Sequence, residues 1–104
     1  MLQSDCHALA EYFRALADGL RLRMLMLLAD RGELNVSGLA RMLRVSQPLV
    51  SWHLRLLTRA GLVQVRKVGR EVYCSLSPDA LRLHIANVSH VLSPSNDTHD
   101  ETRG

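Results

Sequence analysis

The sequence predicts a mainly α-helical domain that carries one small β-hairpin. Apolar side chains recur at the helical period through residues 2–60, and the period changes to two from Leu62 onwards. A short helical pattern and a tight turn precede another helix, whose start is marked by Ser46 as N-cap and Pro48 in the first turn. Four helices, two strands and a fifth helix in this order are typical of a winged helix-turn-helix.

The composition indicates an ordinary globular protein of one domain. The chain has 104 residues, of which 47% are apolar and 22% charged. It contains no apolar run of the roughly 18 to 20 residues that a membrane span needs, and its first residues lack the basic and apolar regions of a secretory signal. We therefore expect a cytoplasmic protein with no membrane partner, a folded domain over residues 1–92 and a disordered acidic tail over residues 93–104.

Two helices are predicted before Gly32, which supplies a C-terminal break. The first helix has one apolar stripe, with Cys6 at its edge and His7 on the far side. The members of this stripe are Leu2, Leu9, Phe13, Leu16 and Leu20. The second helix is marked by Leu22, Leu25 and Leu28.

The next two helices form the predicted helix-turn-helix. The first of them runs from Val36 to Leu43, and Arg44-Val45 is the turn that follows it. The second runs from Ser46 to Ala60 and ends at Gly61. The side chains that we expect to face the core are Leu39, Ala40 and Leu43 in the former and Val50, Leu54 and Leu57 in the latter.

A hairpin and a last helix complete the domain. The hairpin has a basic tip at residues 67–70, where Gly69 supplies the positive φ of the turn. Its predicted buried face consists of Val63, Val65, Val72, Cys74 and Leu76. The last helix starts at Ser77-Pro78-Asp79, and its apolar stripe consists of Leu81, Ile85, Val88 and Leu92.

Positive charge gathers on the helix-turn-helix and the hairpin. Residues 41–76 carry seven Lys or Arg side chains and a single acid, a net charge of +6, whereas the rest of the chain sums to −3. A cationic segment that coincides with this motif predicts a partner that is double-stranded DNA. The side chains that we expect to contact DNA are Ser46, Gln47, Pro48, Ser51, Trp52, Arg55, Arg59, Arg66, Lys67 and Arg70.

Individual side chains suggest distinct roles in this contact. The carboxamide of Gln47 can pair bidentately with adenine, and Arg55 can bind guanine or, more commonly, phosphate. Trp52 has two interpretations, packing against Leu56 or the root of the hairpin, and apolar contact with a thymine methyl group or the sugar-phosphate edge of DNA. His53 lies about 60° from the centre of the core face, so we expect a half-buried structural side chain.

Several motifs resemble one family. Phe13-Arg14-Ala15-Leu16-Ala17-Asp18, followed by Arg21-Leu22-Arg23-Met24-Leu25, is similar to the opening signature of the ArsR/SmtB family of bacterial repressors. Ser46-Gln47-Pro48, Ser51, His53-Leu54, Leu57 and Ala60-Gly61-Leu62-Val63 resemble its recognition helix, and Gly69-Arg70, Tyr73 and Leu76 its wing. The resemblance covers residues 9–92 and implies a homodimeric winged-helix repressor that leaves its operator when an effector binds.

The sequence departs from the family at the positions where many members bind metal. The segment 33–39 has no Cys-x-Cys pair, and neither Asp79-Ala80-Leu81 nor His90-Val91-Leu92-Ser93 reproduces the Asp-x-His and His-x-x-Glu of the zinc sensors. A divalent metal cofactor is thus supported only by scattered residues of ligand type. These are Cys6, His7, His84, His90 and His99. His84 and His90 lie about 120° apart on one helix and cannot converge on one ion within it.

The cysteines and the apolar stripes lead to two further expectations. Both Cys6 and Cys74 fall on the buried side of their elements; a redox pair would need their Cα atoms to lie within about 7 Å. The stripes of the first and last helices exceed what a core of this size absorbs, which favours a homodimer. The expected dimer contacts are Leu9, Phe13, Ile85, Val88 and Leu92.

The sequence therefore favours a sequence-specific DNA-binding repressor, released by a metal ion, a redox change or an unknown ligand. A winged-helix protein-interaction module and a regulator with no sensing site remain the alternatives. The sequence contains no catalytic grouping with credible spacing and no phosphate loop, so we do not expect an enzyme.

Overall fold

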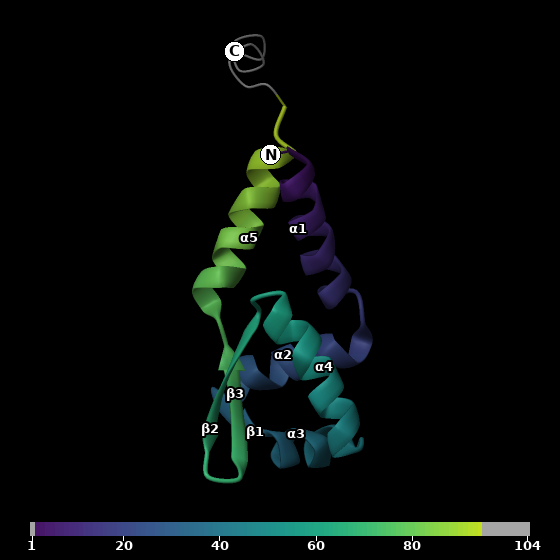
Figure 1. The fold of residues 1–104 in the computed structure, drawn as a ribbon, viewed down its shortest axis with the longest axis vertical. Helices are drawn as coiled ribbons and strands as arrows, with labels where there is room; N and C mark the ends of the chain where they lie inside the picture. The colour runs from purple at the N-terminus through teal and green to yellow at the C-terminus, as the bar shows by residue number, and fades with distance from the viewer. Residues whose placement is uncertain (1, 95–104) are drawn as a thin grey trace.

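The computed structural model describes the backbone of residues 2–94 and the side chains of residues 6–94. Five helices and a small sheet alternate along this part of the chain (Figure 1). In chain order the elements are α1 (Leu2–Leu16), α2 (Gly19–Arg31), β1 (Glu33–Asn35), α3 (Val36–Leu43), α4 (Gln47–Arg59), β2 (Val63–Val68), β3 (Glu71–Leu76) and α5 (Pro78–Val91). Helices α1 and α5 lie at one end of the molecule, and the hairpin tip lies at the other.

The helix-turn-helix forms as predicted, and each of its boundaries has a local cause. Asn35 caps α3 by accepting a hydrogen bond of 2.8 Å from the backbone N–H of Gly38. Arg44 adopts the left-handed conformation at φ 62° and so turns the chain after α3. Ser46 then caps α4, since its hydroxyl oxygen accepts the N–H of Leu49 at 3.3 Å. These caps set where the two helices begin and how they are joined.

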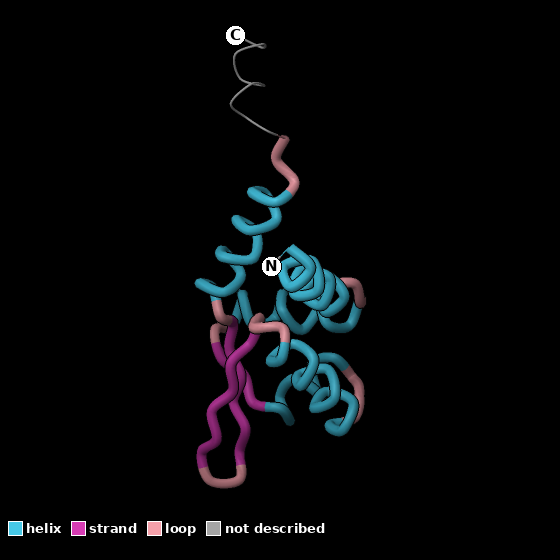
Figure 2. Tube along the Cα trace, turned by 45° about the horizontal axis from the view of Figure 1, so that its top comes forward, coloured by secondary structure: helices cyan, strands magenta, loops and turns pink. Residues whose placement is uncertain are grey.

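The sheet has three antiparallel strands in the order β1-β3-β2. The strands are the magenta segments of Figure 2. Strand β1 was not predicted, so the expected order of four helices followed by two strands is wrong at this point. It has only three residues, which is too short for a period of two to be recognised. Leu34 of β1 pairs with Cys74 of β3, so the strand joins the start of α3 to the hairpin.

The hairpin is longer than its sequence pattern indicated. Both strands have six residues, and only Gly69 and Arg70 remain for the turn, with Gly69 at φ 61°. The predicted buried face is confirmed at Val63 and Cys74, but Val65 is 44% exposed. Beyond its first residue β2 therefore extends away from the core as an exposed ribbon.

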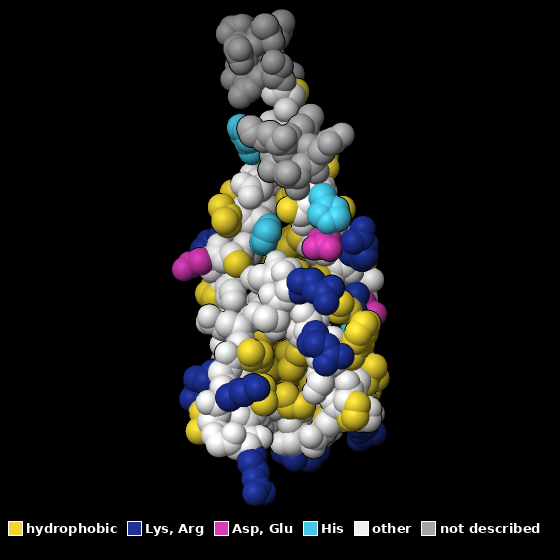
Figure 3. All heavy atoms as spheres, viewed as in Figure 1, with side chains coloured by type: hydrophobic (Ala, Val, Ile, Leu, Met, Phe, Trp, Pro, Cys, Tyr) yellow, Lys and Arg dark blue, Asp and Glu magenta, His cyan; other side chains and the backbone are white. Residues whose placement is uncertain are grey.

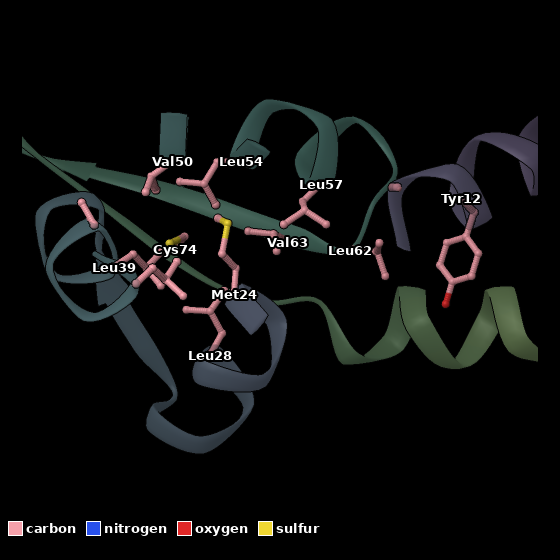
Figure 4. Packing of buried hydrophobic residues seen from close by; sticks show 13 residues of the cluster. Tyr12, Met24, Leu28, Leu39, Val50, Leu54, Leu57, Leu62, Val63 and Cys74 are labelled. Atoms are coloured by element: carbon pink, nitrogen blue, oxygen red, sulfur yellow. The ribbon is translucent and has the colours of Figure 1, made fainter. Parts of the chain in front are cut away.

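The core lies between α2, α3, α4 and the root of the hairpin, and Tyr12 extends it towards α5 (Figure 4). All six side chains predicted to face inward from α3 and α4 are buried. The buried hydrophobic residues are Tyr12, Ala15, Met24, Leu28, Leu39, Ala40, Leu43, Val50, Leu54, Leu57, Leu62, Val63 and Cys74. Because α4 contributes three of them, its opposite face is directed outward.

The predictions for the first two helices need correction. Tyr12 and Ala15 face the core from α1, whereas Phe13 is 46% exposed and Cys6 is exposed. In α2 the buried side chains are Arg21, Met24 and Leu28, and Leu22 of the predicted stripe is exposed. Leu20 belongs to α2, because the chain breaks at Ala17-Asp18, where the Asp18 carboxylate caps the second helix. A leucine-rich segment offers several possible stripes, and packing decides between them.

Helix α5 contains no buried residue, and an aromatic contact joins it to α1. The Tyr12 and His84 rings are stacked, with centroids 4.3 Å apart and planes at 25°. Ser93 and Pro94 follow the helix without forming an element, and residues 95–104 of the predicted tail lie outside the described residues. None of the helices over residues 2–94 is long and apolar enough to cross a membrane.

Candidate nucleic-acid interface

The outward face of α4 carries the side chains that the sequence singled out. Gln47 is exposed in the first turn, Ser51 is half-buried, and Trp52 and Arg55 are exposed. The predicted residues Ser46, Pro48 and Arg59 are exposed as well. A buried apolar face and a polar outer face give α4 the arrangement of a helix that lies in a groove of DNA.

Trp52 and Arg55 form a pair on this face. The Arg55 guanidinium carbon lies 5.4 Å from the centroid of the Trp52 ring, a cation–π geometry. Trp52 is 49% exposed, so the ring is half covered while the guanidinium remains at the surface. The pair thus presents an apolar ring edge and a fork of hydrogen-bond donors side by side.

The basic side chains of the hairpin differ in their freedom. Lys67 and Arg70 are exposed near the tip and form no ion pair within residues 6–94. Arg66 instead forms a bidentate pair with Glu33, at 2.7 Å from its Nη2 and 3.1 Å from its Nε. The pairing lowers the pKa of the Glu33 carboxyl and raises the pKa of Arg66. Arg66 also lies over the ring of Tyr73, with 5.1 Å between guanidinium carbon and centroid.

A hollow lies between α4 and the hairpin, on the face seen in Figure 3. Its volume is about 640 Å³. Valine and leucine side chains form its floor, and the cations Arg55, Arg59 and Lys67 stand around it. The full lining is Val36, Ser51, Leu54, Arg55, Thr58, Arg59, Val65, Lys67 and Val72. The helix and the ribbon therefore border one concave, positively charged surface.

His53 is more deeply buried than the sequence indicated, and its partner was not predicted. Only 8% of His53 and 9% of Arg21 are exposed, and the Arg21 Nη1 lies 3.0 Å from the His53 Nδ1. The same guanidinium donates from Nε to the carbonyl of Ala15 at 2.6 Å and from Nη2 to the carbonyl of Arg14 at 3.2 Å. Arg21 therefore joins the end of α1 to the middle of α4 and fixes the position of α4 relative to α1 and α2.

The candidate metal ligands do not converge within the described residues. No group of three His, Cys, Asp or Glu side chains that could hold an ion occurs in the described part of the chain. His84 stacks on Tyr12. Cys6, His7 and His90 are exposed, and His99 lies outside the described residues.

The two thiols occupy different environments. Cys74 is buried as predicted, and its Sγ lies 3.2 Å from the carbonyl oxygen of Leu34. Burial raises the pKa of this thiol to about 11, which keeps it protonated. Cys6 is exposed and not on the buried side of α1. Both cysteines are free.

The predicted dimer contacts form a partly apolar surface on α1 and α5. Phe13 is 46% exposed, Ile85 57% and Leu92 75%, while Leu9 and Val88 are half-buried. Leu83 on the same helix is 59% exposed. Apolar side chains of this size in one region leave the surface of a single copy incompletely covered.

Comparison with known proteins gives a consistent set of similarities. The profile of the family "Bacterial regulatory protein, arsR family" matches residues 18–65. The chain is 46% identical over 88 residues to "Transcriptional repressor SmtB homolog" of Synechocystis sp., covering 85% of this chain and 63% of that protein. It is also 46% identical over 68 residues to "Arsenical resistance operon repressor" of Escherichia coli, covering 65% of this chain and 58% of that protein. The chain spans less than two thirds of the length of either relative.

Solved structures share the fold over most of the chain. An ArsR-like transcriptional regulator from Rhodococcus sp. RHA1 superposes with a TM-score of 0.76 at 31% identity, covering 88% of this chain and 83% of that one. A homodimeric winged helix-turn-helix DNA-binding domain from Mycobacterium bovis, described as a possible ArsR-family transcriptional regulator, gives a TM-score of 0.69 at 30% identity. That similarity covers 88% of this chain and 85% of the other.

Proposed function

Because this chain belongs to the ArsR family of bacterial regulatory proteins, we propose that it is a sequence-specific DNA-binding transcriptional repressor. The single observation that carries the proposal is the outward face of α4, where polar and basic side chains stand opposite a fully buried apolar face. The net charge of +6 over residues 41–76 supports a polyanionic partner. The family is one of transcriptional regulators, not of enzymes.

We propose that α4 reads base edges in the major groove while the hairpin follows the backbone beside it. Gln47 and Arg55 provide the donors and acceptors for base contacts, and the Trp52 ring edge provides an apolar contact for a thymine methyl group. Lys67 and Arg70 at the hairpin provide phosphate contacts. Arg66 contacts a phosphate only when it gives up its ion pair with Glu33. The remaining proposed contacts are Ser46, Pro48, Ser51 and Arg59.

We propose that the chain acts as a homodimer in the cytoplasm. The neighbour from Mycobacterium bovis is described as homodimeric, and the exposed apolar side chains of α1 and α5 supply a surface for the same arrangement. A two-fold axis would pair Leu9, Phe13, Ile85, Val88 and Leu92 with their symmetry mates. Two copies of α4 would then meet two half-sites of an operator.

We further propose that an effector releases the protein from its operator. One relative is named as an arsenical resistance operon repressor. A metal ion, an oxidant and an organic ligand are the three classes of effector to test. No three ligand side chains converge within the described residues, so a metal would need ligands from a second copy or from outside them. An oxidant would reach Cys6 first, because Cys74 is buried.

The test is a fluorescence anisotropy titration of the protein on DNA from its own upstream region and on an unrelated duplex. Gln47→Ala should reduce the preference for the upstream duplex, whereas Lys67→Ala should weaken binding to both and lower the salt slope by about 1. Arg23→Gln, which removes an exposed cation of α2, is the matched control and should leave the binding to both duplexes unchanged. Equal losses from Gln47→Ala on both duplexes would contradict the assignment of α4 as the reading helix.

A second series of titrations tests the effector. Zn²⁺, Ni²⁺, Cu⁺, arsenite and an oxidant are added in turn to the complex with the upstream duplex. Release by one of them identifies the class of effector. Retention of the complex with all of them would overturn a metal or redox effector and favour an organic ligand or a regulator without a sensing site.

A further inference from the structure

A second cavity of the molecule lies between α1 and the C-terminal half of α4, at the end of α4 opposite its N-cap. Its volume is about 180 Å³, several times the roughly 30 Å³ that one water molecule occupies. Its lining is Glu11, Arg14, Ala15, Arg21, Leu56, Arg59 and Ala60. Three guanidinium groups therefore share one small concave surface with a single carboxylate.

Arg21 is the buried member of this group, and its guanidinium forms no ion pair. The Asp18 carboxylate accepts the backbone N–H of Arg21 at 3.0 Å and is the anion that interacts with its charge. The side chain is 9% exposed, and its three nitrogens contact the carbonyls of Ala15 and Arg14 and the imidazole of His53. These acceptors occupy three of the five N–H donors of a guanidinium, and no carboxylate oxygen within residues 6–94 lies within 4.0 Å of it. A buried cation whose anion lies beyond ion-pair distance is incompletely compensated, so an anion that reaches its two remaining N–H groups would be bound.

The other charged groups of the cavity are also available. Arg14 and Arg59 are exposed and form no ion pair within the described side chains. The Glu11 carboxylate lies 3.9 Å from the Nε2 of His7, on its own helix, and does not pair with any of the three arginines. The lining thus has a net charge of +2.

We propose that this cavity binds an oxyanion of the phosphate class between Arg14, Arg21 and Arg59. Planar guanidinium groups bind such anions through pairs of parallel N–H···O bonds, and the lining supplies three of these groups. The anion comes either free from solution or from the backbone of a DNA duplex. It links α1 and α2 to α4, because Arg14 belongs to the first, Arg21 to the second and Arg59 to the third.

The test is a titration of the full chain with inorganic phosphate at constant ionic strength. The NMR signals of the arginine Nε–H groups are recorded at each phosphate concentration. The signals of Arg14, Arg21 and Arg59 should shift together and saturate, and chloride should not reproduce the shifts. Arg14→Gln should weaken phosphate binding at least about tenfold, the effect of losing one charge-assisted contact. Glu11→Gln should strengthen binding, since it removes the one negative charge of the lining.

Arg23→Gln is the control for net charge and should bind phosphate like the original chain, because Arg23 lies outside the cavity. Arginine signals that do not shift with phosphate, or equal weakening by Arg14→Gln and Arg23→Gln, would overturn the proposal. An unrelated DNA duplex is then added to the phosphate-loaded protein. Displacement of phosphate assigns the site to a backbone phosphate, and retention assigns it to a free anion. The phosphate titration contains no DNA, so its result does not depend on the proposed function.

Discussion

Replacing His53 with Phe tests whether the buried contact between α2 and α4 holds the reading helix in place. Phe approximately fills the volume of the imidazole but cannot accept the hydrogen bond that the Arg21 Nη1 makes at 3.0 Å. The substitution therefore removes the polar contact and leaves little cavity. His53→Gln serves as the matched variant, because its carboxamide oxygen restores an acceptor.

The expected loss follows from the burial of both partners. A hydrogen bond from a charged donor contributes about 1.5 to 3 kcal/mol, and neither partner here has water as a ready substitute. His53→Phe should thus lower the free energy of unfolding by about 2 kcal/mol, a large share of the roughly 5 to 15 kcal/mol typical of a domain. With urea m-values of about 1 to 3 kcal/mol per molar, the midpoint should fall by about 1 M. His53→Gln should recover part of this loss.

The assay is urea unfolding followed by circular dichroism at one protein concentration, because dimerisation would make stability depend on concentration. A double-mutant cycle with Arg21→Met isolates the contact from the two carbonyl bonds that Arg21 also makes. The coupling between Arg21→Met and His53→Phe should be about 1.5 kcal/mol or more. A coupling below about 0.5 kcal/mol would refute the claim that this contact positions α4.

Three further outcomes are expected from the same structure. Glu33→Gln releases Arg66 from its ion pair, so binding to any DNA duplex should strengthen and its salt slope should rise by up to about 1. Unchanged anisotropy titrations would show that Arg66 does not reach DNA. In thiol labelling with an aromatic disulfide at pH 8, exposed Cys6 should react at once and buried Cys74, whose pKa is raised to about 11, only as fast as the protein unfolds; two fast thiols would contradict the burial. Phe13→Glu places a charge among the exposed apolar side chains of α1 and should shift sedimentation towards the monomer, whereas a monomeric original chain would refute the proposed dimer.

The parts of the fold that the sequence predicted are those where local rules and packing agree. Around α3 and α4 the caps, the turn and the apolar period all indicate the same boundaries, and the structure confirms them from Asn35 to Ala60. The period of two and Gly69 predict the hairpin, and the structure confirms it, with Gly69 at a positive φ of 61°. Its length was underestimated, because Lys67 and Val68 continue the strand through pairing that no local pattern reveals.

The first two helices show why periodicity alone was insufficient. Leucines occupy several sides of α1 and α2, so the pattern does not determine which side is buried. The predicted stripe contains Phe13 and not its neighbour Tyr12, yet Tyr12 is the residue that is buried and stacks on His84. That contact joins residues far apart in the sequence, and only the folded chain reveals it.

The burial of Arg21 is the feature that the sequence is least able to predict, and the reason is electrostatic. A binary pattern assigns every arginine to the surface, because an isolated buried charge is costly. Here the cost is offset by three hydrogen-bond acceptors and by the nearby Asp18 carboxylate. Two of the acceptors are carbonyls at the end of α1 that the helix itself cannot satisfy. The partner ring of His53 comes from a helix 32 positions later in the chain. Any residue type can supply a backbone carbonyl as an acceptor. The site between α1 and α4 that binds this guanidinium therefore has no sequence motif by which it could be predicted.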